Sequence, residues 1–279
     1  MIPDTPPDTP PDTQNEEYWR NYLTKGSPRE IAARRFLIRL PRGPRCRICA
    51  APFGGIGAPV MRLIGKRQSD NNPHMCEACF TFISRHHGGA EIELTLLFAD
   101  IRGSTTLAEG MPAGEFRAIL DRFYTVASQA IFEHDGGVDK FVGDGVVAFF
   151  FPMIAGERHA ARGVEAARAL LRATGHADPA GPWVPVGAGV HTGISWMGAV
   201  GEGSQTVLTA VGDAVNTTAR LASLAGAGEI LVTVDAARAA GLDPDLERRS
   251  LELKGKAAVT EVVTLKVGAA AETAVHIES

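Results

Sequence analysis

One aspartate stands where an apolar strand gives way to residues that suit a helix start. Asp100 follows the apolar run at 96–99, which reads as a buried strand, and Gly103, Ser104 and Thr105 come almost directly after it. The N–H groups at a helix start and the positive end of the helix dipole favour phosphate oxygens. We therefore expect Asp100 to hold a divalent cation beside phosphate groups bound by Gly103, Ser104 and Thr105.

A second aspartate, Asp144, is flanked by Gly143 and Gly145 between the strand-like segments 138–142 and 146–150. This is strong turn chemistry, so a hairpin with the carboxylate at its tip is expected. Two carboxylates on neighbouring strand ends, with few other protein ligands, suit magnesium-dependent phosphoryl chemistry. A lone Asp-Gly also occurs in many ordinary turns, so a third segment decides between these interpretations.

The third segment, 209–221, carries an amide and a cation at helical spacing. Asn216 and Arg220 lie four residues apart, so on a helix they project from one face and can meet one ligand. An arginine offers a planar fork for phosphate oxygens, and Lys254 further along offers a point charge. Each alone would be an ordinary solvated side chain. Together with the two aspartates they indicate a site for a metal and a nucleotide triphosphate.

In order and in local spacing, these motifs resemble the class III nucleotidyl cyclases over about residues 91–267. The resemblance implies two magnesium or manganese ions at each active site. The residues to which it assigns roles are Asp100, Asp144 and the backbone carbonyl of Ile101 for the metals, Asn216 and Arg220 for the transition state, and Lys254 for phosphate.

Purine choice is also implied by the resemblance. Lys140 and Thr209 fall at the purine-selecting positions, where guanylyl cyclases typically place Glu and Cys, so the pair favours ATP. The implied reaction converts ATP to 3′,5′-cyclic AMP and pyrophosphate in a homodimer whose two sites each draw the aspartates from one subunit and the other groups from its partner. The alternatives are a guanylate cyclase and a non-catalytic nucleotide or metal sensor that acts through a partner. Nucleic acid is not expected as a partner.

One position departs from the family pattern. A basic residue is expected on the strand 186–190, where this chain has Gly187, and Arg102 beside the first metal ligand is the candidate to compensate. A Gly187→Arg variant would test for such a deficit. His191, which precedes a Thr-Gly pair, is expected to be structural, since a general base is defined by its geometry.

Four cysteines, the full complement of the chain, form two Cys-x-x-Cys pairs. They are Cys46, Cys49, Cys76 and Cys79. Four thiolates suit a tetrahedral zinc of structural or sensory function. An iron–sulfur or mononuclear iron centre and a thiol redox switch are the alternatives. His74, two residues before Cys76, is a candidate replacement ligand.

Charge divides the chain near residue 90. Residues 16–90 carry 13 Lys and Arg against 5 Asp and Glu, whereas residues 91–279 carry 15 against 24. We expect a Pro/Asp/Thr tail without structure at 1–15, a basic helix and the four-cysteine module at 16–90, the cyclase domain at 91–267 and a flexible tail at 268–279. Within the module, Ser27-Pro28-Arg29-Glu30 predicts a capped, basic amphipathic helix to about Leu40.

Hydrophobic periodicity completes the fold prediction. The elements expected after the first strand are helices at 112–134, 158–173 and 216–224 and strands at 138–142, 146–150, 186–190, 194–200, 229–234 and 259–267. This order predicts an α/β sandwich of the ferredoxin-like βαββαβ type. Because no apolar run approaches the roughly 20 residues that cross a bilayer and no signal-peptide pattern is present, a cytoplasmic location is expected.

Overall fold

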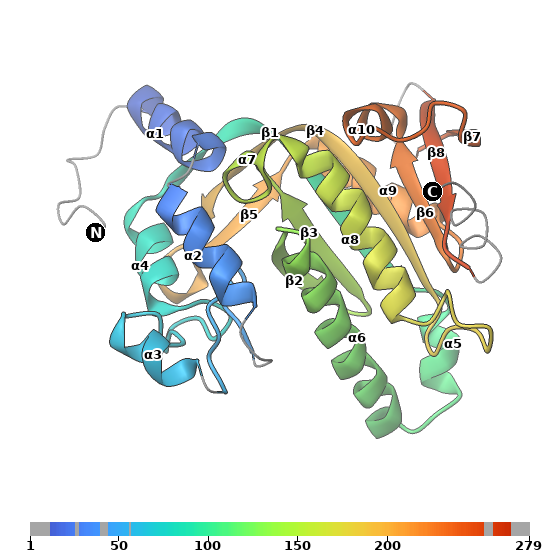
Figure 1. Ribbon diagram of the computed structural model, residues 1–279, viewed down its shortest axis with the longest axis horizontal. Coiled ribbons are helices and arrows are strands. Elements are labelled where there is room, and N and C mark those ends of the chain that lie inside the picture. The colour runs from blue at the N-terminus through green and yellow to red at the C-terminus, as the bar shows by residue number, and fades with distance from the viewer. Residues whose placement is uncertain (1–11, 26–27, 40–43, 56, 254–258, 269–279) are drawn as a thin grey trace, which may run out of the picture. The chain divides into compact units, whose positions relative to one another are not determined.

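The computed structural model describes residues 12–25, 28–39, 44–55, 57–253 and 259–268, and these form two compact units (Figure 1). Unit 1 comprises the described residues of Met1–Ile92 together with Phe151–Ile154 and Ile194–Gly212. Unit 2 comprises Glu93–Phe150, Ala155–Gly193 and the described residues from Asp213 onward. The first change of unit lies close to the boundary expected near residue 90, but later segments of the chain return to unit 1.

Unit 2 is built on a βαββαβ core. Its elements are β1 (Gly88–Ile101, whose first residues belong to unit 1), α6 (Ala113–Glu133), β2 (Gly137–Val142), β3 (Gly145–Phe150), α8 (His159–Ala173) and β4 (Val186–Val200, whose last residues belong to unit 1). The strands lie in the order β2-β3-β1-β4, and β3 is antiparallel to both β1 and β2. This order confirms the ferredoxin-like prediction.

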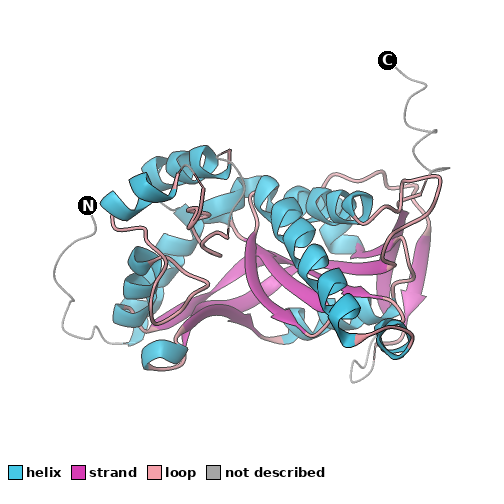
Figure 2. Ribbon diagram, turned by 90° about the horizontal axis from the view of Figure 1, so that it is seen from below, coloured by secondary structure: helices cyan, strands magenta, loops and turns pink. Residues whose placement is uncertain are grey.

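Helices α6 and α8 pack against each other and against this sheet (Figures 1 and 2). On α6 the buried side chains Phe123, Ala127 and Ile131 recur at helical spacing, which is the pattern of a helix with one face on a core. On α8 a Cβ added to Gly163 would lie 2.7 Å from Cγ2 of Thr95. The missing side chain therefore allows α8 to lie close to β1.

The sheet of unit 2 continues beyond β4. The further elements are α5 (Ser104–Glu109), η1 (Gly156–Arg158), α9 (Asp213–Leu224), β6 (Glu229–Thr233), α10 (Val234–Ala239), β7 (Arg248–Leu251) and β8 (Thr260–Lys266). The short helix α7 (Pro152–Ala155), which precedes η1, falls in unit 1 except for its last residue. Strand β6 runs parallel to β4 and antiparallel to β8. Leu221 at the end of α9 packs with Leu231 and Val262 of β6 and β8 in a buried cluster, which fixes the helix on the sheet.

Unit 1 combines short helices with a hairpin. Its elements are α1 (Asp12–Lys25), α2 (Pro28–Ile38), α3 (Ala58–Leu63), α4 (Glu77–Arg85), η2 (Gly203–Gln205) and β5 (Val207–Val211), which pairs with the end of β4. Trp19 of α1 is fully buried and meets the ring of Phe82 edge-on at a centroid distance of 5.8 Å. These contacts anchor α1 on α4.

The structure corrects several expectations. Helix α1 begins at Asp12, inside the expected tail at 1–15, because Asn15 donates to the His87 carbonyl oxygen at 2.7 Å and Trp19 finds a core. Gly88 and Gly89, at the expected boundary near residue 90, lie within β1. A Cβ on Gly89 would lie 2.4 Å from the Met197 carbonyl oxygen, so glycine permits a close backbone approach there.

Two strands expected at 186–190 and 194–200 form the single strand β4, and the sequence prediction missed β5, β7 and α10. The expected helix at 27–40 is α2, and Ser27 and Leu40 lie outside the described residues. Arg34 of α2 is 5% exposed and donates to the Ile48 carbonyl oxygen at 3.2 Å, so this basic side chain supports the first cysteine loop instead of forming part of a solvated face.

None of the helices in the described part of the chain has both the length and the apolar character that a bilayer crossing needs.

Candidate active site and cysteine cluster

The two aspartates are brought together by the register of β1 and β3. Asp100 is the Cα partner of Gly145, and the Ile101 N–H donates to the Asp144 carbonyl oxygen at 3.3 Å. Gly143, in the turn, has φ +58°, a conformation in which glycine carries no steric cost. The expected hairpin is thus confirmed, and both carboxylates and the Ile101 backbone lie at one end of one strand pair.

A tyrosine that sequence reasoning missed supports this turn. The Tyr124 hydroxyl, on α6, donates to the Gly143 carbonyl oxygen, and its ring stacks on Phe141 of β2 with a centroid distance of 4.1 Å. Burial, and next the negative charge of Asp144, raise the pKa of Tyr124, so the phenol stays protonated and able to donate. No local sequence signal could have found the contact, because the partners lie 19 residues apart.

Arg102 is tied into the same corner. Its guanidinium forms an ion pair with Asp100 and donates to the carbonyl oxygens of Ser223 at 3.0 Å and Ala225 at 3.3 Å. Burial lowers the pKa of Arg102, and the charge of Asp144 partly offsets that effect. Arg102 therefore links Asp100 to the end of α9.

The donor set suits a hard divalent cation. Asp100 Oδ1 is buried and makes no hydrogen bond of regular geometry, although Arg102 lies against it as an ion pair. Asp144 is half-buried, and two carboxylates leave positions for water and phosphate oxygens, as magnesium prefers.

The remaining expected residues lie on separate elements. Asn216 and Arg220 lie one turn apart on α9, as expected, and among the described residues their side chains form no hydrogen bond or ion pair. Lys140 on β2 is exposed and lies 3.3 Å from Asp139. Thr209, on β5 of unit 1, is buried.

Gly103 has φ +67° and precedes α5, which begins at Ser104 and includes Thr105, so the expected helix start is confirmed. Lys254 lies outside the described residues.

The position of Gly187 explains the departure from the family pattern. A Cβ added there would lie 2.7 Å from the Ala225 carbonyl oxygen and 2.9 Å from that of Gly226. Backbone atoms cannot yield as a flexible side chain can, so the strand has no room for a basic residue. The Gly187→Arg variant is therefore a poor test of a charge deficit, because it would displace the segment after α9.

His191 makes a structural contact, as expected. Its Nδ1 lies 2.9 Å from Oγ1 of Thr233 on β6. The neighbouring Thr192 lies 2.8 Å from Oγ1 of Thr95 on β1. These inward-facing contacts keep the His-Thr-Gly segment in a continuous strand.

The four cysteines come together in unit 1, and their Sγ atoms all lie within 4.8 Å of one another. None is in a disulfide, and Sγ of Cys49 is 3.6 Å from Sγ of Cys76. The Cys46 N–H donates to the Ala51 carbonyl oxygen at 2.9 Å, which closes the first loop, and Cys76 lies at the start of α4. Four convergent thiols fit a tetrahedral metal such as zinc.

Charge at the cluster is uneven. Burial raises the pKa of Cys46 well above its usual value. The pKa of Cys49 is lowered well below its usual value, chiefly by the hydrogen bond with Cys46 and then by those with Cys76 and Cys79. Burial alone would lower the pKa of Lys66, but the attraction of the thiolates, that of Cys49 first, raises it overall. His74 is not part of the cluster, and its pKa is lowered by burial and then by Arg47.

A ferredoxin-like sheet that brings two aspartates to one hairpin is the kind of scaffold that metal-dependent phosphoryl chemistry uses. A family model described as the adenylate and guanylate cyclase catalytic domain matches residues 90–266. The chain belongs to this family. The match begins after the cysteine cluster.

Curated relatives cover the same region. Adenylate cyclase 1 of Rhizobium meliloti (strain 1021) is 35% identical over 146 residues, which make up 50% of this chain and 22% of that protein. An adenylate cyclase of Anabaena cylindrica is 31% identical over 183 residues, 62% of this chain and 36% of that protein. The chain thus matches only a minor part of the length of either relative.

Solved structures show the same fold. The guanylyl cyclase Cya2 is 26% identical, with a TM-score of 0.59 over 65% of this chain and 95% of that one. The adenylyl cyclase CyaB from P. aeruginosa is 27% identical, with a TM-score of 0.55 over 64% of this chain and 96% of that one. Neighbours of both purine specificities therefore share this fold.

Proposed function

We propose that this chain is an adenylate cyclase that converts ATP to 3′,5′-cyclic AMP and pyrophosphate at the interface of a homodimer. The observation that carries the proposal is the pairing of Asp100 with Gly145, which sets two carboxylates side by side in a cyclase-family domain. Lys140 and Thr209 support ATP as the substrate, and both curated relatives named above are adenylate cyclases.

Asp100, Asp144 and the backbone carbonyl of Ile101 are the groups that would hold two magnesium or manganese ions. Ions bound there would neutralise the triphosphate and lower the pKa of the ribose 3′-hydroxyl. The chain's own part is to orient the substrate, because the nucleophile belongs to the nucleotide itself and a near-attack geometry removes most of the entropic barrier.

In the proposed reaction the 3′ oxygen attacks the α-phosphorus and loses its proton to water. The bond from that phosphorus to the α–β bridging oxygen breaks, and pyrophosphate leaves with the electron pair. Arg220 and Asn216 donate to the oxygens on which negative charge grows. Their side chains have no other partner among the described residues, which supports a role in binding a ligand. The reaction needs ATP and the cysteine cluster needs reduced thiols, and a cytoplasmic location would supply both.

The test is to incubate the purified chain with manganese and either ATP or GTP and to quantify cyclic nucleotides by chromatography. Asp144→Asn should lower the rate by about 100-fold or more, the scale of losing a preorganised electrostatic group. Asp235→Asn on α10 is the matched control, because Asp235 is an exposed carboxylate in the same unit. Equal activity of Asp144→Asn and the wild type would contradict the proposal.

Purine choice has its own test. Lys140→Glu combined with Thr209→Cys should move the preference from ATP toward GTP. Cyclic GMP as the main product of the unaltered chain would instead make the chain a guanylate cyclase. Nucleotide binding without any cyclic product would favour the sensor alternative.

We further propose that the four cysteines hold zinc as a structural or sensory element that regulates the domain. The convergence of four free thiols supports this assignment. Elemental analysis should find about one zinc per chain, as a four-thiolate site requires, and Cys79→Ser should lose it. Iron with visible absorption would replace the zinc assignment by an iron centre, and metal-free protein that forms disulfides on mild oxidation would indicate a redox switch.

A further inference from the structure

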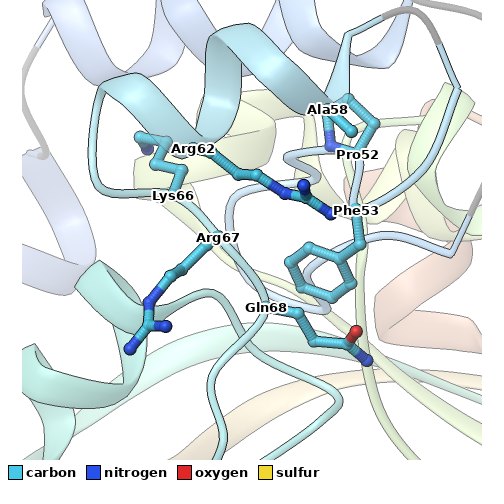
Figure 3. A pocket seen from close by; sticks show the side chains of 7 residues that line it. All are labelled: Pro52, Phe53, Ala58, Arg62, Lys66, Arg67 and Gln68. Carbon is cyan, nitrogen blue, oxygen red and sulfur yellow. The ribbon is translucent and has the colours of Figure 1, made fainter.

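A pocket of about 360 Å³ lies in unit 1, in the stretch of chain between the two cysteine pairs (Figure 3). Its lining residues come from the loop before α3, from α3 itself and from the segment that follows it. The volume falls within the roughly 300–1,000 Å³ of small-molecule sites. None of these residues belongs to the cyclase motifs.

The lining is strongly cationic. It includes Arg62, Lys66 and Arg67 and no acidic side chain. Arg67 lies 3.3 Å from Asp70, but this carboxylate is 82% exposed and its charge is largely screened by water. Within the described ranges Arg62 and Lys66 form no ion pair, and Lys66 is half-buried. Lys66 is attracted by the thiolates of the cysteine cluster, and Figure 3 shows its ammonium and the Arg67 guanidinium directed away from Phe53. Arg62 is therefore the cation of this lining that an anion beside Phe53 would meet.

One wall of the pocket is flat and apolar. The ring of Phe53 is half-exposed, and Figure 3 shows the guanidinium of Arg62 and the amide of Gln68 extending beside it. Gln68 Nε2 donates to the Pro73 carbonyl oxygen at 2.8 Å, which fixes the amide and leaves its oxygen as an acceptor. A ring with an adjacent acceptor suits a flat heterocycle that carries N–H groups.

We propose that this pocket binds a nucleoside phosphate. Arg62 offers a planar fork to the phosphate, while the base lies against Phe53 and donates to Gln68. The ligand is a free nucleotide or the 5′-phosphorylated end of a nucleic acid, since both present the same group. The site does not depend on the cyclase reaction, and a binding measurement does not involve turnover.

The test is calorimetric titration of the full-length, metal-replete chain with adenosine 5′-monophosphate, without added magnesium. The parallel ligands are adenosine, inorganic phosphate and a 5′-phosphorylated single-stranded oligonucleotide. Arg62→Gln should weaken nucleotide binding by about tenfold or more, as expected for a lost charge-assisted contact. Arg85→Gln is the matched control, because Arg85 is an exposed arginine of α4 outside the pocket.

Weaker binding of both adenosine and inorganic phosphate than of the nucleotide supports the proposal, because both halves of the ligand are then recognised. If the oligonucleotide binds more than about tenfold tighter than the nucleotide, the ligand is the 5′-phosphorylated end of a nucleic acid. The proposal is overturned by equal affinity in the Arg62→Gln and control variants, by phosphate binding as tight as nucleotide binding, or by the absence of nucleotide binding at millimolar concentration. Unchanged thermal unfolding of both variants ensures that a loss of affinity reports on the pocket.

Discussion

Asp144 is positioned by a local turn and by one hydrogen bond from a residue distant in sequence. The turn between Gly143 and Gly145 is local, but its support is the Tyr124 hydroxyl on α6, which donates to the Gly143 carbonyl oxygen. A hydrogen bond to the backbone of this turn limits the directions in which the carboxylate can point. Tyr124 is therefore a positioning residue for the proposed metal site.

Tyr124→Phe should weaken manganese binding and lower the cyclase rate by about tenfold, the effect of one lost hydrogen bond. The ring still stacks on Phe141, so the free energy of unfolding should change little. Thr125→Val, which removes an exposed hydroxyl from the neighbouring position, is the control. Manganese titration followed by electron paramagnetic resonance would measure the affinity, and a lower rate with unchanged metal affinity would remove Tyr124 from this role.

The environment of His176 makes the free energy of unfolding depend on pH. The backbone N–H of Val186 donates to its Nε2 at 3.0 Å, so the ring must be neutral, and burial lowers its pKa. Because the unfolded chain takes up the proton first, stability is full above the unfolded pKa near 6.5 and falls as the pH drops toward the folded pKa. The loss is at most about 1.4 kcal/mol per pH unit for one proton.

His176→Gln keeps an acceptor for Val186 without a titrating group. Urea unfolding between pH 5 and 7.5 should show a smaller slope for this variant than for the wild type. Identical slopes would exclude His176 as the source of the dependence.

Local chemistry could be predicted from the sequence, whereas long-range contacts could not. The turn at Asp144 and the spacing of Asn216 and Arg220 follow from neighbouring residues, and the structure confirms both. The contact of Tyr124 and the lack of space at Gly187 depend on segments that meet only after folding.

At the scale of elements, Gly163 allows α8 to pack closely on β1. Gly163→Ala should lower the free energy of unfolding by about 1–3 kcal/mol, because the new methyl would overlap Cγ2 of Thr95 at 2.7 Å. Gly114→Ala in α6 is the matched control, since nothing lies within 4 Å of an added Cβ there. That change should instead stabilise the helix by about 0.5–1 kcal/mol. Similar urea midpoints for both variants would disprove this account of the α8 contact.

Helices with long apolar stripes were the most predictable elements. The expected helices at 112–134 and 158–173 match α6 and α8 closely. Strand β4 was divided in two because His-Thr-Gly is typical of a turn, yet Thr192 finds Thr95 across the sheet and the strand continues. Short strands such as β5 and β7 have too few residues for alternation to be distinct.

At the scale of the whole molecule, the proposed homodimer can be tested by mixing inactive chains. If Asp144 and Asn216 of one site come from different subunits, Asp144→Asn and Asn216→Ala should complement each other. Half of the randomly mixed dimers are heterodimers with one intact site of two, so activity should recover to about one quarter of the wild-type rate. Each variant incubated alone is the control, and no recovery after verified subunit exchange would refute shared sites.

Helix α6 connects the turn of Asp144 to distant points of unit 2. Tyr124 lies in the middle of this 21-residue helix, and its hydroxyl donates to the turn that carries Asp144. A helix of this length is a stiff rod, so a small axial slide or roll at either end moves the phenol with it. A partner bound at either end of α6 would therefore act on the position of Asp144 through Tyr124, without touching the residues of the proposed active site.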